Sequence, residues 1–309
     1  MLSAVRSVAF PRFVPAAAMR PTGAASGAAG LRFRWLGTAG FVVEAGATTI
    51  VIDPYLSRPS ARTLLTSRVS PDERAVRASL PARVDAVLCG HSHFDHLLDA
   101  PLAASLTGAK LVGSETTLAF GRAHGLPEGQ LVHVPARGLV TTIGDIEIRF
   151  VPSLHGRILL GRVPFPGVVS APPRVPARAW HYRMGGAFGI LLGAGDAAIY
   201  HNGSADLVDA ELDGLAADVL LVGIAGWRST PNYVPRLVRA LAPKVVVPCH
   251  HDAFFAPLRA GVRLWPGVDV AGFVAEVRHH RTATQIVTPL YDDVVRYDAR
   301  GRHAFVERA

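Results

Sequence analysis

The chain has 309 residues, half of them hydrophobic, and a formal net charge of +8 at pH 7. This composition supports a substantial apolar core, but no apolar run approaches the roughly 20 residues of a membrane-spanning helix, and two cysteines make no disulfide framework. The basic segments show no aromatic interleaving and no zinc ribbon, which leaves nucleic acid as only a minor option for a partner.

Residues 1–30 are rich in Ala, Pro, Gly and Arg and contain no acidic residue. Two arginines and two prolines among the first 15 residues interrupt the apolar run that a secretory signal requires. We therefore predict a disordered extension over 1–30 and a cytoplasmic protein, with a cryptic N-terminal export signal as the alternative. Residues 31–309 are predicted to form a single domain.

From residue 31 onward, short apolar runs alternate with turn signals, which is typical of strands. The predicted strands are 41–44, 49–52, 86–89, 110–113, 146–151, 189–192, 198–201, 219–222 and 244–247. The predicted helices are 97–105, 114–124, 204–215 and 233–241, the last after the capping residues Ser229 and Thr230. This order of mixed strands and returning helices indicates a layered α/β fold rather than an all-β barrel.

The most informative segment is His91-Ser92-His93-Phe94-Asp95-His96, which directly follows the predicted strand 86–89. Imidazoles and carboxylates are ligands that zinc and similar first-row metals prefer. The spacing turns His91 and His93 to one side, and we expect Asp95 and His96 to turn back on the following loop. Two ligand pairs on one short segment suit a dinuclear site, whose ions lie roughly 3.5–4 Å apart. A solvated histidine-rich loop is the alternative.

This hexapeptide resembles the HxHxDH signature of the metallo-β-lactamase superfamily. Four further segments resemble the rest of that family's pattern in the same order: an opening hairpin at 34–41, a strand ending in Asp53-Pro54, His155 at a strand end, and His250 after residues 245–249. Together they cover about residues 31–258. The resemblance implies a four-layer αββα sandwich with a metal site along one edge.

The resemblance also implies a set of ligands: His91, His93 and His155 for a first metal, and Asp95, His96 and His250 for a second. The expected cofactor is one or two Zn²⁺ ions, with manganese or iron as alternatives. Metal-bound hydroxide would attack a carbonyl or phosphoryl centre beside Asp95. Asp53 would orient a ligand histidine through its ring N–H. His251 and Asp252 are candidates for the same orienting work or for proton delivery to the leaving group, or they form a satisfied surface pair.

One position departs from the family pattern. Where the family places a bridging aspartate after a strand, this chain has Ser204 in Asn202-Gly203-Ser204-Ala205-Asp206. A serine hydroxyl is neutral and is a poor bridge between two cations. Three outcomes stay open: Asp206 supplies the bridge from one turn later, the second metal site is weak, or only one metal binds.

The segment after His155 contains five arginines and no acidic residue before Asp196. Such a cationic segment favours a substrate with a carboxylate or phosphate, and Arg157 is the expected contact because it lies nearest to His155. The proline-rich stretch 161–185 also carries several apolar residues, and we predict a loop that covers the substrate. A solvated surface insertion is the alternative.

These features predict a metal-dependent hydrolase that acts on an ester, lactone or phosphodiester, nearer to the lactonase and phospholipase-like branch of the superfamily. The expected substrate is a small anionic molecule with an apolar part. A degenerate, non-catalytic binding protein is the first alternative, and a di-iron redox enzyme is the second. The sequence leaves the oligomeric state open.

Overall fold

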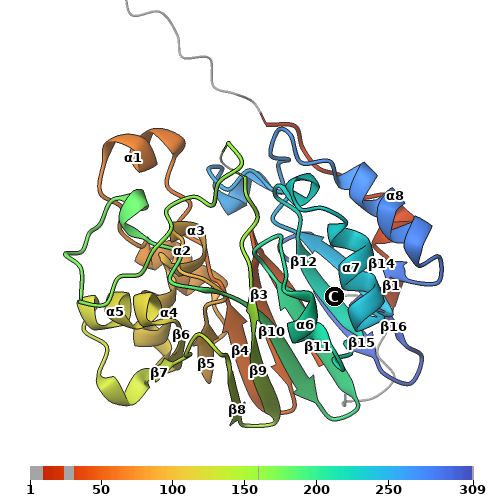
Figure 1. The fold of residues 1–309 in the computed structure, drawn as a ribbon, viewed down its shortest axis with the longest axis horizontal. Helices are drawn as coiled ribbons and strands as arrows, with labels where there is room; N and C mark the ends of the chain where they lie inside the picture. The colour runs from red at the N-terminus through yellow and green to blue at the C-terminus, as the bar shows by residue number, and fades with distance from the viewer. Residues whose placement is uncertain (1–9, 24–30, 159, 308–309) are drawn as a thin grey trace, which may run out of the picture.

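A computed structural model describes residues 10–23, 31–158 and 160–307 of the chain. In these ranges two β-sheets face each other, and helices cover the outer side of each sheet (Figure 1). The first sheet has nine described strands in the order β1-β16-β15-β2-β3-β4-β5-β6-β7. The second has seven described strands in the order β14-β13-β12-β11-β10-β9-β8.

Both sheets mix parallel and antiparallel pairs. The strands of the first sheet are β1 (Thr22–Gly23), β2 (Leu31–Gly37), β3 (Gly40–Ala45), β4 (Thr48–Ile52), β5 (Ala86–Leu88), β6 (Lys110–Gly113), β7 (Leu131–His133), β15 (Val294–Asp298) and β16 (His303–Glu307). Those of the second are β8 (Leu139–Ile143), β9 (Ile146–Ser153), β10 (Ala187–Ala194), β11 (Ala197–Asn202), β12 (Val219–Gly223), β13 (Val245–Cys249) and β14 (Gln285–Ile286).

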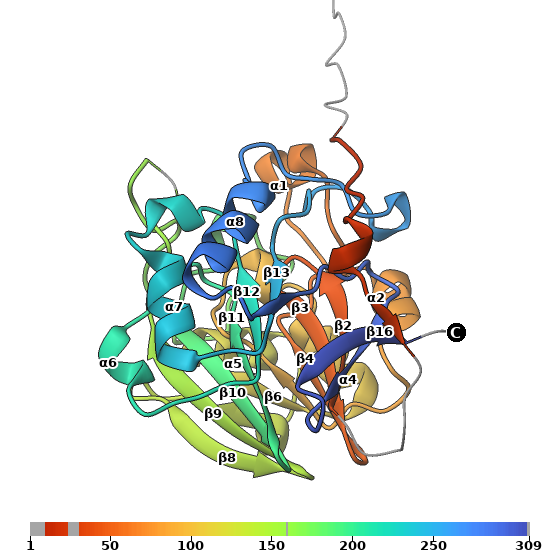
Figure 2. The same cartoon turned by 90° about the vertical axis from the view of Figure 1, so that its right-hand side faces the viewer.

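The helices form two outer layers. They are α1 (Ala61–Thr66), α2 (Glu73–Ser79), α3 (Phe94–Leu97), α4 (Ala100–Thr107), α5 (Glu115–Ala123), α6 (Asp209–Leu212), α7 (Tyr233–Leu241) and α8 (Val270–His280). Helices α2, α4 and α5 pack with the first sheet, and α6, α7 and α8 with the second, along one side of Figure 2. None of the helices in the described ranges has the length and hydropathy needed to cross a membrane.

The alternation of side chains along each strand builds the core. In β4, Ile50 and Ile52 enter the core between the sheets, whereas Val51 packs under the helices of the first sheet. In β12, Leu221 faces the same central core and Leu220 packs under α7 and α8. Because successive side chains leave a strand on opposite faces, two buried sheets create three apolar layers. The predicted four-layer αββα sandwich is confirmed.

Each predicted strand overlaps an observed one, and α7 coincides with the predicted helix 233–241. The predicted helix 97–105 is divided, because Pro101 lacks an amide proton and suits the first turn of a new helix. The predicted helix 204–215 is wrong outside α6. Ala205 adopts a left-handed φ of 57°, which a continuing helix does not allow.

Part of the segment predicted to be disordered belongs to the folded structure. Strand β1 pairs in parallel with β16, the Phe13 N–H donates to the Val262 carbonyl at 2.9 Å, and Arg20 forms an ion pair with Asp293. The expectation of disorder is therefore wrong for residues 10–23. Residues 1–9 and 24–30 lie outside the described residues.

Candidate metal centre

The candidate ligands gather where strand ends meet at one edge of the sandwich. His155 follows β9 and His250 follows β13, and these two strands run in the same direction through the pairings of β10, β11 and β12. His91 follows β5, and Asp53 directly follows β4, which pairs in parallel with β5. Loops after parallel strands converge at one edge of a sheet, so residues distant in sequence come together here.

His91, His93 and His155 form a compact group that we call the first ligand cluster. Their ring centroids lie 4.7–4.9 Å apart in each pair. One potential ligand atom from each lies within 4.8 Å of the others. Zinc–nitrogen bonds are about 2.0–2.1 Å long, so two nitrogens on one ion lie at most about 4.2 Å apart, and a small contraction of the cluster would let all three surround one ion.

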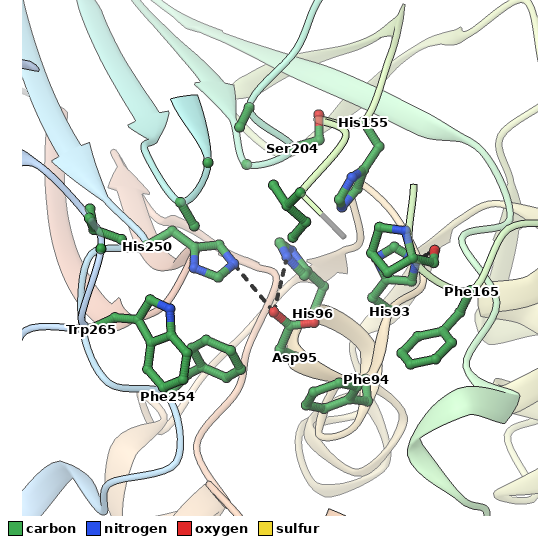
Figure 3. A pocket seen from close by; sticks show the side chains of 18 of the residues that line it. His93, Phe94, Asp95, His96, His155, Phe165, Ser204, His250, Phe254 and Trp265 are labelled. Atoms are coloured by element: carbon green, nitrogen blue, oxygen red, sulfur yellow. Dashed lines mark hydrogen bonds and ion pairs between the residues drawn. The ribbon is translucent and has the colours of Figure 1, made fainter. Parts of the chain in front are cut away.

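Asp95, His96 and His250 form the second ligand cluster. The Asp95 Oδ2 lies 3.3 Å from the His250 Nε2 and 3.9 Å from the His96 Nε2 (Figure 3). Asp95 and His96 are in the short helix α3 rather than on the expected loop. The two clusters are adjacent, because the His91 and His96 rings lie only 3.7 Å apart between centroids.

Hydrogen bonds fix the tautomer of three of the histidines. The ring N–H groups of His93, at Nε2, and of His155, at Nδ1, donate to the carbonyls of Pro164 and Gly156, each at 2.8 Å. The His96 Nδ1–H donates to Asp53 Oδ2, also at 2.8 Å. Because these oxygens only accept, each neutral ring keeps its other nitrogen unprotonated. That nitrogen is free to bind a metal.

The electrostatics of the clusters favour the ionisation states that metal binding needs. Burial, together with neighbouring histidines, lowers the pKa of His93 to about 4 and that of His155 to about 3. Burial also lowers the pKa of His91 well below its ordinary value. For Asp95, burial opposes ionisation, but His96 and His250 outweigh it and hold the pKa below its usual range. At neutral pH these four groups are unprotonated imidazoles and a carboxylate. His96 differs from them, because Asp53 and Asp95 outweigh burial and raise its pKa above the ordinary value.

The donor set fits a metal ion. The buried His91 Nε2 has no hydrogen-bond partner in the part of the chain that the structure describes. A buried polar atom without a partner is costly, and a metal ion would satisfy this lone pair. Cys89 and Cys249 are buried and free, and neither is among the residues of the two clusters.

Asp53 supports His96 from behind. It is fully buried, its Oδ2 accepts from His96, and its Oδ1 accepts from the Gly90 N–H at 2.7 Å. We expect Asp53→Asn to weaken metal binding by roughly 10–100-fold, because the carboxylate both orients the ring and raises its basicity. Competition with a chromophoric chelator would measure the affinity.

The matched control for this substitution is Asp99→Asn. Asp99 is equally buried, and its carboxylate accepts from the Leu56 N–H at 2.6 Å and the Ser57 N–H at 2.8 Å without touching a candidate ligand. We expect Asp99→Asn to leave metal affinity within about threefold of the parent. An equal loss in both variants would refute the role of Asp53.

Ser204 lies at the pocket, but Asp206 does not reach it. The Ser204 hydroxyl donates to the Leu154 carbonyl at 2.9 Å, and the residue lines the pocket beside His155. The Asp206 Oδ1 instead accepts from the Leu207 N–H at 2.8 Å and lies 3.8 Å from Arg236. The option that Asp206 supplies the bridge is therefore not supported.

We expect Ser204→Asp to raise the metal content toward two ions per chain. A carboxylate there would add a negative charge and a potential shared ligand between the clusters. Elemental analysis after dialysis measures the content, and Ser204→Asn is the neutral control of similar size. Two tightly held ions in the parent protein, or an equal gain in both variants, would contradict this prediction.

Two predicted site residues lie elsewhere. The His251 ring is fully buried, stacks on Trp35 at 4.8 Å and meets the edge of Phe13, so it does not face the pocket as a proton donor would. Its packing also rules out the surface pair considered for it. Arg157 is exposed and does not line the pocket. The contact of Arg157 with an anionic group therefore stays a prediction that the pocket lining does not support.

The sequence interpretation missed most of the pocket wall. A cavity of about 490 Å³ opens over the two clusters. Five aromatic side chains line it, and we call them the aromatic wall: Phe94, Phe165, Phe254, Phe255 and Trp265. Only Phe165 belongs to the predicted covering loop. The adjacent pair Phe254-Phe255, shortly after the last candidate ligand His250, was a sequence feature that could have predicted an aromatic side of the pocket.

An αββα sandwich with two clusters of candidate metal ligands at its loop edge is typical of metallo-hydrolases. Residues 32–250 match the family model described as the beta-lactamase superfamily domain. The chain belongs to the metallo-β-lactamase superfamily. A UPF0173 metal-dependent hydrolase from Pyrobaculum arsenaticum is 30% identical over 227 residues, which is 72% of this chain and 85% of the relative.

Two solved structures share the fold. Igni18, a metallo hydrolase from Ignicoccus hospitalis, superposes with a TM-score of 0.56 at 20% identity, over 87% of this chain and 98% of that chain. CmlA, a diiron beta-hydroxylase from Streptomyces venezuelae, gives a TM-score of 0.52 at 18% identity, over 86% of this chain and 54% of that chain. The different activities of these two proteins show that the fold alone does not select the reaction.

Proposed function

We propose that this protein is a hydrolase that uses one or two divalent ions, zinc first, to cleave a small ester, lactone or phosphodiester. The observation that carries the proposal is the convergence of six candidate ligand side chains in two adjacent clusters, five of which line one pocket. The relative from Pyrobaculum arsenaticum, named as a metal-dependent hydrolase, supports the same assignment.

The residues divide the work as follows. The first and second ligand clusters would each hold an ion, and Asp53 would keep His96 in the tautomer that binds it. A bound divalent ion lowers the pKa of a coordinated water and polarises a carbonyl or phosphoryl oxygen. Asp95 lies at the pocket, where its carboxylate would offset the charge of a bound ion and would pass the proton that water loses to the leaving alcohol. The water oxygen ends in the acid product, and the alcohol leaves with a proton.

The alternative of a non-catalytic binding protein rests on Ser204 alone. Against it stand six ligand side chains, three of them held in a metal-binding tautomer by hydrogen bonds. A di-iron redox enzyme remains compatible with the fold, as the CmlA structure illustrates, but the sequence contains no flavin-binding motif.

Elemental analysis and a substrate panel test the proposal together. We expect at least one ion per purified chain, and turnover of at least one member of a panel of lactones, carboxylic esters and phosphodiesters. Chelation should abolish turnover, and Zn²⁺, Mn²⁺ or Fe²⁺ should restore it. Turnover that survives complete metal removal would refute the proposal. A full complement of metal without turnover across the panel would favour the binding protein.

A further inference from the structure

The aromatic wall begins directly at the ligands. The Phe254 ring lies 5.8 Å from the His250 ring, and the Phe165 ring lies 6.2 Å from the His93 ring. Figure 3 shows Phe254 and Trp265 on the His250 side of the pocket and Phe165 on the His93 side. A molecule whose reacting bond lies over the ligands must therefore place its remaining atoms against aromatic rings.

One part of the wall is a preformed three-ring cluster. Phe254, Phe255 and Trp265 have ring centroids 4.2–5.3 Å apart in each pair. Backbone contacts connect this cluster to the residues that follow His250. The Trp265 backbone N–H donates to the His251 carbonyl at 2.9 Å, and Asp252 forms an isolated antiparallel β-bridge with Leu264. Because the rings are held by backbone pairing next to His250, their faces are available at low ordering cost.

The charge of the pocket lining is equally informative. Among the described residues that line the pocket, none is an arginine or a lysine, and Asp95 in the second ligand cluster is the only acidic residue. Apolar Ile158 and Val268 also line the pocket. A charged group placed there would lose its hydration without gaining a partner, which is unfavourable for either sign of charge.

We propose that the non-reacting part of the substrate is an uncharged aromatic ring, seated against Trp265 and Phe254. The inference rests on the proposed function, because that function places the reacting bond over the ligands. A cavity of about 490 Å³ holds a molecule of this kind, since pockets for small organic ligands measure roughly 300–1,000 Å³. Ring-on-ring contact adds selectivity for an aromatic group over an aliphatic group of equal size.

Calorimetric titration of the metal-loaded protein with three amides, two of them neutral and one anionic, tests the ligand class. Phenylacetamide is the neutral aromatic probe, hexanamide is the neutral aliphatic probe, and 4-sulfophenylacetamide carries a weakly basic anion at the far end of the ring. We expect phenylacetamide to bind several-fold more tightly than hexanamide and at least about tenfold more tightly than the sulfonate. Equal or tighter binding of the sulfonate would overturn the inference.

Substitution of the wall tests its location. Trp265→Leu should weaken phenylacetamide binding by on the order of tenfold and leave the affinity for hexanamide nearly unchanged. Trp180→Leu is the matched control, because Trp180 stacks with Arg178 on the 161–185 segment and does not line the pocket. Phe255→Leu provides a second wall variant if Trp265→Leu does not fold. Unchanged aromatic preference in both wall variants would overturn the inference.

Turnover separates this inference from the proposed function. If esters are hydrolysed in a metal-dependent way but the probes show no aromatic preference, the substrate class is wrong and the hydrolase assignment stands. If the probes discriminate as expected and depend on Trp265 but no ester, lactone or phosphodiester is cleaved, the ligand class stands and the hydrolase assignment is wrong.

Discussion

Asp95→Asn is expected to lower kcat/KM by roughly a thousandfold on the best substrate of the panel. Asp95 is the one carboxylate among the residues of the two ligand clusters, so its loss removes the negative charge that offsets a bound cation. It is also placed to accept a proton, and a general base contributes about 10²–10⁴-fold. Steady-state kinetics and elemental analysis of the same preparations measure both effects.

Asp209→Asn is the control for this prediction. Asp209 forms an ion pair with Arg236, and 65% of the Asp209 side chain is exposed. Asp209 belongs to neither ligand cluster. This variant should keep kcat/KM and metal content within about twofold of the parent. If Asp95→Asn retains more than about a tenth of the parental activity, Asp95 has neither role.

The convergence of the candidate ligands follows from the sequence, because each group of them comes shortly after a strand. His155 and His250 are about 95 residues apart, yet both follow strands that end at the same edge of the second sheet. Strand periodicity locates those ends to within two residues, and the Asp53–His96 contact follows from the parallel pairing of β4 and β5. Local pattern and sheet direction therefore explain why these side chains come together, whereas their assignment as metal ligands rests on the family resemblance and stays a prediction.

The pocket wall was harder to predict because no periodicity marks it. Trp265 is positioned at the pocket by the isolated β-bridge between Asp252 and Leu264, and no local sequence pattern predicts this bridge. Residues 10–23 also lack periodicity, and their order depends on distant partners such as β16. Arginine content suggested an anionic substrate, but sequence proximity to His155 does not turn the Arg157 side chain into the pocket.

The loop that presents His250 is held in an unusual backbone conformation. His250 has φ of 57° and Thr38 has φ of 51°, both in the left-handed region, which is uncommon for residues other than glycine and is a clear outlier for a β-branched residue such as Thr38. The His250 N–H donates to the Thr38 carbonyl at 2.7 Å, and the Thr38 N–H donates to Asp252 Oδ1 at 2.9 Å. Strained backbone persists only where its surroundings enforce it, and here Asp252 is the enforcing group.

Arg58→Met is expected to lower the free energy of unfolding by about 3–5 kcal/mol. The Arg58 and Asp252 side chains are almost completely buried and form an ion pair at 2.5 Å, and Tyr291 also donates to Asp252. Removing one partner leaves an uncompensated charge in the interior, which costs far more than losing a surface pair. Urea unfolding of the metal-free protein measures the change without a contribution from bound ions.

Two further variants isolate the charge as the cause. Arg77→Met breaks the ion pair between Arg77 and Glu73, and both of these side chains are 59% exposed. This variant should lower the free energy of unfolding by less than about 1 kcal/mol. The double variant Arg58→Met/Asp252→Asn removes both charges and should recover part of the stability that Arg58→Met loses. The reason is that the introduced amide oxygen can still accept from the Thr38 N–H, while the amide nitrogen in the place of Oδ2 can donate to the Tyr291 hydroxyl, and neither atom carries a full charge. If the double variant is as unstable as the single one, lost packing rather than an unpaired carboxylate explains the effect, and Asp252 does not enforce the His250 loop through its charge.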